Sequence, residues 1–122
     1  MAPPLAYPVS RVVVHGEFPL PATAAELVVL RDCAKELCDT AFARGCKTVH
    51  CPRNCSGTVH EHRKTDGAGP LRIYFSMAHG CVVLLHWGRK QHQDADIAVA
   101  CTRGDWVAKA SPAQLAKLAS LA

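Results

Sequence analysis

The stretch LRIYFSMAHGCVVLLHWGRKQHQDADIAVA, residues 71–100, carries the clearest structural pattern in the chain. Apolar and polar residues alternate from Leu71 to Phe75, which is the period of a strand with one buried face. A second apolar run, residues 81–87, follows after Ala78-His79-Gly80, a gap short enough for a hairpin turn. The pattern predicts two antiparallel strands, a cationic and polar loop, and a short helix over residues 94–101.

A third strand is predicted over residues 58–64, before a turn at residues 66–70. Together the three strands form an antiparallel meander, and strand alternation separates its two faces. With helices on one side of the sheet only, the other side would be a polar, cationic concave surface formed by Glu61, Arg63, Arg72 and Tyr74.

The flanking segments predict further elements. Residues 11–15 form a β-branched run typical of a strand, and Thr23 with Glu26 forms a capping box before a helix that ends at Gly45. Proline, asparagine and glycine indicate a loop over residues 46–57. A last helix is expected over residues 111–121, capped by Ser111 with Pro112 in its first turn.

These elements predict an α+β fold in which an N-terminal strand and helix pack on a small antiparallel meander, with short C-terminal helices. The chain has 122 residues, the size of one domain. It is 49% hydrophobic and 20% charged, and no apolar run approaches the roughly 18 residues that cross a bilayer. The first ten residues, MAPPLAYPVS, do not resemble a secretory signal, so we expect a cytoplasmic protein.

The chain has seven cysteines. Because cytoplasmic thiols stay reduced, we expect these cysteines to be free thiols rather than disulfides. Four of them fit small apolar core positions: Cys33, Cys38, Cys81 and Cys101.

Positive charge is concentrated in the middle of the chain. The net charge is +4, and residues 58–92 hold five basic against two acidic side chains together with five of the seven histidines. Such a block favours an anionic partner, most commonly a nucleic acid.

Two parts of the chain, GTVHEHRKTDGAGPLRIYF and VVLLHWGRKQHQDADIAVA, resemble the toxins of bacterial toxin–antitoxin modules in the RelE/ParE superfamily. The resemblance is nearest to the HigB toxins and the phage addiction-module killer proteins. It spans residues 57–100, and its elements are Gly57, Glu61-His62-Arg63, Leu71-Arg72-Ile73-Tyr74, Leu84-Leu85 and the pattern K-x-x-Q-x-x-D-I-x-x-A that starts at Lys90. The chain departs from the family pattern at His62, Leu71 and His86-Trp87.

The resemblance implies a RelE-like fold and an mRNA interferase, a ribosome-dependent endoribonuclease that inhibits translation without a metal or other cofactor. Its implied partners are mRNA on the ribosome and a cognate antitoxin protein, with which it would form a hetero-oligomer. No membrane partner is implied.

Cleavage of this type, by a ribose 2′-hydroxyl attacking the adjacent phosphate, needs a base, cationic donors and an acid. Arg72 is expected to stabilise the phosphate through paired donors, and Lys90 would add a second cation. The sequence leaves the acid and base roles open among Glu61, His92 and Tyr74, of which His92 titrates nearest to neutral pH. The expected RNA contacts are Arg63, Arg89 and Gln93. Asp96 is expected to cap or hydrogen-bond, and Ile97 to pack.

Three other hypotheses stay open. A ParE-like toxin would poison DNA gyrase without nuclease chemistry, and an inactive remnant would keep only the fold. A small zinc-binding module would draw its ligands from Cys46, His50, Cys51, Cys55, His60 and His62, although these lack paired C-x2-C knuckles.

Overall fold

The β4–β5 hairpin, formed by strands Gly69–Ala78 and Cys81–Gly88, lies at the centre of the molecule. Its turn is His79-Gly80, and both residues have positive φ, 51° and 75°. Positive φ at both central residues matches the right-handed twist of the flanking strands, and glycine adopts it without strain. The hairpin predicted from the sequence is confirmed.

The computed structural model describes residues 11–19, 21, 23–39, 47–49, 58–66 and 69–120. In chain order its other elements are β1 Arg11–Val14, α1 Ala24–Asp39, β2 Lys47–Val49, β3 Val59–Asp66, the 3-10 turn η1 Lys90–His92, α2 Gln93–Lys109 and α3 Pro112–Ala116. The chain is therefore α+β, as predicted.

One mixed sheet holds all the strands, in the order β1-β5-β4-β3-β2. β3, β4 and β5 form the predicted antiparallel meander, and β1 joins its β5 edge in parallel, with Arg11 beside Cys81 and Val14 beside Leu84. β2 pairs with β3. The prediction of a loop over residues 46–57 is thus wrong at 47–49, because backbone pairing with β3 stabilises a strand that the local composition did not indicate.

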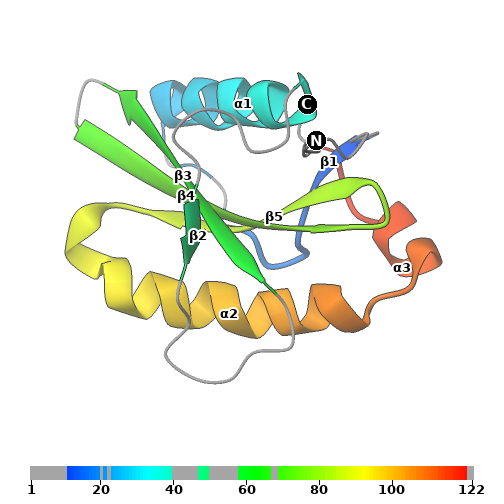
Figure 1. Ribbon diagram of the computed structural model, residues 1–122. Coiled ribbons are helices and arrows are strands. Elements are labelled where there is room, and N and C mark those ends of the chain that lie inside the picture. Colours follow the sequence, from blue (N-terminus) through cyan, green and yellow to red (C-terminus); the bar gives the residue numbers. More distant parts are fainter. Residues whose placement is uncertain are drawn as a thin grey trace, which may run out of the picture.

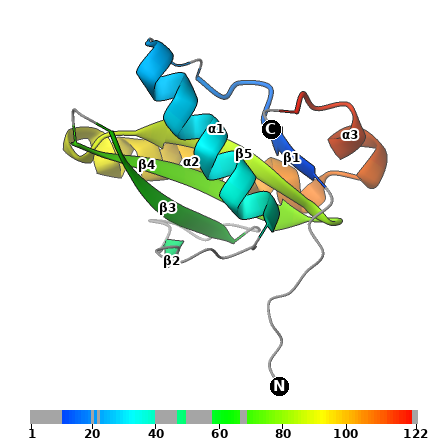
Figure 2. The ribbon, with the colours of Figure 1, turned by 90° about the horizontal axis from the view of Figure 1, so that it is seen from above.

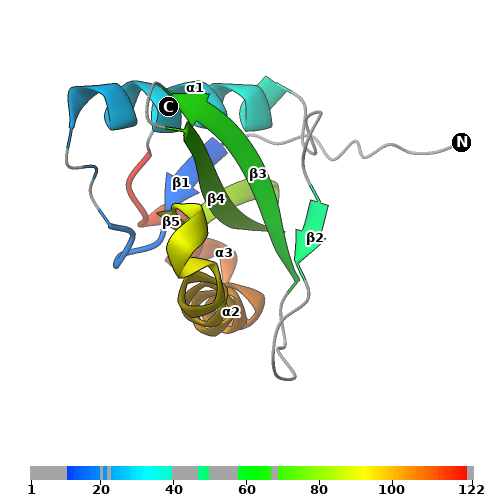
Figure 3. The same cartoon turned by 90° about the vertical axis from the view of Figure 1, so that its left-hand side faces the viewer.

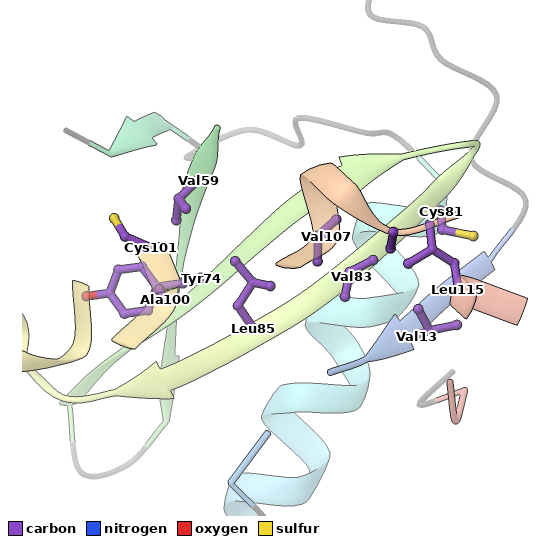
Figure 4. Close-up of a cluster of buried hydrophobic side chains, with 11 residues drawn as sticks. Val13, Val59, Tyr74, Cys81, Val83, Leu85, Ala100, Cys101, Val107 and Leu115 are labelled. Carbon is purple, nitrogen blue, oxygen red and sulfur yellow. The ribbon is translucent and has the colours of Figure 1, made fainter. Parts of the chain in front are cut away.

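Helices cover both faces of the sheet: α1 lies on one face and α2 on the other (Figures 1 and 3), and seen from above α1 lies in front of the sheet with α2 behind it (Figure 2). On the α1 face, Leu71, Ile73 and Phe75 pack with Leu30 and Leu37 of the helix. On the α2 face, valines and leucines of β1, β3 and β5 pack with Ala100, Cys101 and Val107 (Figure 4). The prediction of helices on one side only is wrong, and α2 covers the surface that was expected to be open.

Local capping signals were good guides to where helices begin. Thr23 Oγ1 accepts from Glu26 N at 3.1 Å and Glu26 Oε1 accepts from Thr23 N at 3.2 Å, so the predicted capping box is formed. Ser111 caps α3 in the same reciprocal way with Gln114, and Pro112 is its first residue. The predicted end of the first helix at Gly45 lies outside the described residues.

Helix ends were predicted less well. α2 continues to Lys109, well past the expected end near Cys101, because its apolar side chains remain buried against the sheet up to Val107. Gly104 suits this interior position, since a Cβ there would lie 3.0 Å from Val59. α3 ends at Ala116 rather than at residue 121, and the chain then turns so that Ser120 bridges to Val13 of β1. This return to the sheet prevents a longer helix.

Cys33 and Cys81 are buried thiols outside any disulfide, whereas Cys101 is buried and disulfide-bonded. The expected core positions are confirmed for these three, and the expectation of a reduced thiol is wrong for Cys101, because spacing along the sequence does not reveal which cysteines the fold brings together. The side chain of Cys38 lies outside the described part of the structure. None of the helices in the described ranges has the length and apolar character that a membrane crossing requires.

Candidate functional site

A β-bulge in β5 determines which side chains meet beneath α2. Phe75 of β4 pairs with Leu84, but Tyr74 pairs with His86, so Leu85 is an extra residue on β5. The extra residue reverses the alternation after it. His86 and Gly88 therefore share the α2 face with Tyr74 and Arg72, instead of facing α1.

Three charged side chains form a cluster at the β3–β4 pair. Arg63 and Arg72 are directly opposite each other, an arrangement that by itself is repulsive. The carboxylate of Glu61 relieves it: its Oε2 accepts from Arg63 Nε at 3.0 Å and lies 3.6 Å from Arg72 Nε. Glu61 and Arg72 are almost fully buried, with 1% and 5% of their surface exposed, whereas Arg63 has 49% of its side chain exposed. The expected open cationic surface is thus wrong for Glu61 and Arg72, because α2 covers them.

Tyr74 is fully buried beside this cluster. Its ring packs next to Ala100 of α2, and its hydroxyl points away from Leu85 (Figure 4). Burial and the nearby carboxylates of Glu61 and Asp96 raise the pKa of Tyr74 to about 12. At neutral pH the hydroxyl therefore keeps its proton and can only donate or accept a hydrogen bond.

Several polar atoms in this region have no hydrogen-bond partner within the described residues: Arg72 Nε and Nη1, the Tyr74 hydroxyl oxygen and Asp96 Oδ2. Buried polar groups are nearly always paired, and an unsatisfied one costs about 1–3 kcal/mol. A group of such atoms at one place is typical of a site that completes its hydrogen bonds with a ligand or ordered water.

Asp96, in the first turns of α2, is held by His86. The carboxylate Oδ1 lies 2.8 Å from His86 Nε2, and Arg103 Nη1 lies 3.3 Å from His86 Nδ1 and 2.8 Å from the Leu85 carbonyl oxygen. Because Arg103 can only donate, His86 Nδ1 accepts and Nε2–H donates to Asp96. Asp96 does not cap α2; it hydrogen-bonds across to the sheet.

Gly88 makes that position possible. A Cβ at residue 88 would overlap the Asp96 carboxylate, so only glycine leaves room for it. Gly88 is also directly opposite Arg72 in the β4–β5 register. The Asp96 carboxylate thus lies over the same end of the sheet as the arginine cluster.

A cleft of about 390 Å³ opens at this end of β5. It is lined by Pro19, Glu26, His86, Trp87, Gly88, Arg89, Gln91, His92 and Asp96. Trp87 Nε1 donates to the Pro19 carbonyl oxygen at 2.8 Å, and Arg89 Nη2 lies 3.4 Å from Glu26 Oε2. These contacts fix one wall of the cleft to the segment before α1 and to the first turn of α1.

The residues expected in the site therefore fall into two groups. Glu61, Arg72, Tyr74 and Arg63 meet at the β3–β4 pair, as strand alternation predicted. Arg89 and the exposed His92 line the cleft, and Gln93 is the half-buried first residue of α2. Lys90 begins η1, but its side chain lies outside the described residues.

Sequence reasoning missed the residues that link the two groups, above all His86, Gly88 and Arg103. Gly88 had no signal of its own, because its relation to Asp96 depends on the bulge. Ile97 packs against the α2-side core, as predicted.

Of the six side chains considered for zinc, only His60 and His62 belong to the described residues. His62 Nε2 lies 3.0 Å from Glu36 Oε1 of α1, and His60 packs on Phe75 with ring centroids 5.3 Å apart. Burial lowers the pKa of His60. In the described ranges, no three histidine, cysteine or acidic side chains are close enough to hold a metal ion together.

Comparison with known proteins gives no match: no family model, no curated protein and no solved structure is significantly similar to this chain.

Proposed function

We propose that the protein is the toxin of a type II toxin–antitoxin module and cleaves mRNA on the ribosome in the cytoplasm, with a RelE-like fold. The resemblance over residues 57–100 supports this proposal, and so does the order of elements: a strand and a helix, then a short strand, a three-stranded meander and a helix. The observation that carries it is the Glu61–Arg72–Tyr74 cluster, in which buried donors that have no hydrogen-bond partner among the described residues adjoin a carboxylate.

This cluster has the groups that cleavage by a 2′-hydroxyl requires. Glu61 accepts the hydroxyl proton while the 2′-oxygen attacks phosphorus, and Arg72 donates to the phosphate oxygens as negative charge grows on them. Tyr74 adds a neutral donor, because its pKa near 12 keeps it protonated. The 5′-oxygen leaves with a proton from His92, and the products are a 2′,3′-cyclic phosphate and a free 5′-hydroxyl.

Access to the cluster is from the side of Arg63, whose side chain is half-exposed. A phosphate held there still has to reach Arg72, which is 5% exposed beneath α2. Productive binding in this proposal therefore includes a shift of the first turns of α2 away from the sheet. The cognate antitoxin would bind over the same opening and keep RNA out.

The experiment is to induce the protein in a bacterial host and to follow growth together with primer extension on an abundant mRNA. The wild type is expected to arrest growth and to leave discrete cuts in translated regions. Arg72→Lys keeps the buried positive charge beside Glu61 but loses the paired donors with which a guanidinium binds phosphate. We therefore expect this variant to stay folded and to leave no cuts.

Gln114→Ala, in the capping box of α3 and far from the cluster in the fold, is the matched control and should still cut. Growth arrest with intact transcripts would instead favour a gyrase poison. Continued growth despite soluble, folded protein would favour an inactive remnant.

A further inference from the structure

We infer that the cleft at the end of β5 binds one nucleobase of single-stranded RNA, and specifically a base that carries an exocyclic amino group. The inference rests on the proposed function and assigns a recognition role to the cleft, of which the proposed cleavage chemistry uses only His92. It follows from the shape, the charge and the backbone of the cleft.

The shape suits a flat ring. Trp87 is fixed by its hydrogen bond to the Pro19 carbonyl oxygen, so its indole and the Pro19 ring are rigid apolar walls. Arg89, held by Glu26, adds a planar guanidinium at the rim. A volume of about 390 Å³ is at the lower end of the range for small-molecule sites, which is roughly 300–1,000 Å³. Aromatic and guanidinium planes are the usual stacking surfaces for unpaired bases.

The charge of the lining excludes phosphate as the preferred occupant. Glu26 and Asp96 contribute two carboxylates against the single described guanidinium of Arg89, which is already engaged with Glu26. In this lining the two carboxylates balance Arg89 and a protonated His92, so a phosphate would meet no net positive charge, whereas at Arg63 and Arg72 two guanidinium groups share the one carboxylate of Glu61. Amino groups of cytosine, adenine or guanine are donors and complement carboxylate oxygens, whereas uracil presents an acceptor at the same ring position as the cytosine amino group.

The backbone adds hydrogen-bonding capacity. β1 pairs with β5 only as far as Leu84, so on that side residues 86–88 have no neighbouring strand in the described part of the chain. A gap of three residues is shorter than most strands, which disfavours the addition of a peptide strand at this edge. The unpaired backbone of three residues does match the length of one base edge.

The position of the cleft connects base recognition with cleavage. Gly88 lines the cleft and is directly opposite Arg72. A base in the cleft therefore places its own sugar-phosphate at the end of the sheet where the Glu61–Arg72 cluster lies.

Tryptophan fluorescence tests the inference directly, because the chain has only two tryptophans, Trp87 and Trp106. In the Trp106→Phe protein, Trp87 is the sole reporter. The probes are 2′-O-methylated hexanucleotides, which cannot be cleaved: oligocytidine, oligouridine and an abasic strand of the same length. We expect saturable quenching by oligocytidine, at least tenfold weaker binding of oligouridine, and no quenching by the abasic strand.

Two arginine substitutions separate the cleft from the surface in general. Gln91 is exposed and lines the cleft, so Gln91→Arg should block it and weaken oligocytidine binding at least tenfold. Ala98 is exposed on α2 outside the cleft lining, and Ala98→Arg adds the same charge there without this loss. Equal quenching by cytidine, uridine and abasic strands, or equal binding by the two variants, overturns the inference.

The outcome is independent of the cleavage experiment. Discrete mRNA cuts without a Trp87 response would reject the base site and leave the proposed nuclease intact. A selective Trp87 response without cuts would reject the nuclease and leave a base-binding site.

Discussion

The carboxylate of Asp96 occupies the space that a side chain at residue 88 would need, and His86 holds it there through a 2.8 Å contact. This relationship joins α2 to the end of β5 and brings the helix over the buried arginine cluster.

Gly88→Ala is expected to destabilise the protein by about 1–3 kcal/mol, because the new methyl group must displace the carboxylate from His86. Urea denaturation measures the loss. Asp96→Ala removes the obstacle, so Gly88→Ala should cost much less in that background. Additive effects of the two substitutions would show that the residues do not compete for this space.

Tyr74→Phe is expected to change stability little at neutral pH, since the hydroxyl has no partner among the described residues. The pKa of the Tyr74 hydroxyl is about 12 in the folded protein and about 10 in the unfolded chain. Wild-type stability should therefore fall as pH rises above 10, by about 2 kcal/mol more than that of Tyr74→Phe at pH 12. Parallel curves for the two proteins between pH 9 and 12, from urea denaturation, would contradict the assignment.

Glu61→Gln is expected to destabilise the protein by about 3–5 kcal/mol, because it leaves the buried Arg72 without its anion. Adding Arg72→Met should recover most of that loss, since the pair is then replaced by neutral groups of similar size. Chemical denaturation of the single and double variants gives the comparison. If the double variant is no more stable than Glu61→Gln, the burial of Arg72 is not the cause.

Reduction of the Cys101 disulfide is expected to lower the free energy of unfolding by about 2–4 kcal/mol. Urea titrations with and without a reductant measure the difference. Denatured without reductant, the protein should show at most five reactive thiols, because one disulfide consumes two of its seven cysteines. Seven thiols under those conditions would be inconsistent with the bond.

Local signals in the sequence were sufficient for much of the fold. The alternation in residues 71–75 identified the two faces of β4, and the residues Thr23 and Ser111 identified the starts of two helices. Each of these patterns depends on neighbours within a few positions, so no knowledge of the tertiary structure is needed.

The site was only partly predictable, because its geometry depends on two long-range effects. Alternation showed that Arg72 and Tyr74 share a polar face, but it could not show that α2 covers that face. The extra residue Leu85 moves the side of His86 and Gly88 from the α1 face of the sheet to the α2 face. A run of apolar residues gives no sign of such a bulge. Asp96 could be recognised as a hydrogen-bonding residue, but its partner depends on that bulge.

The parallel pairing of β1 with β5 also has a consequence for synthesis on the ribosome. β1 emerges first, yet its neighbours are β5 and the segment around Ser120, whose hydroxyl donates to Val12 across 108 residues of sequence. At a translation rate of about 5–20 residues per second, β1 waits roughly 5–20 s for that last contact. The β4–β5 hairpin, with its two-residue turn, closes within microseconds of its release. The nascent chain therefore carries an unpaired, β-branched segment at least until β5 has been synthesised, and the contact with Ser120 forms later still.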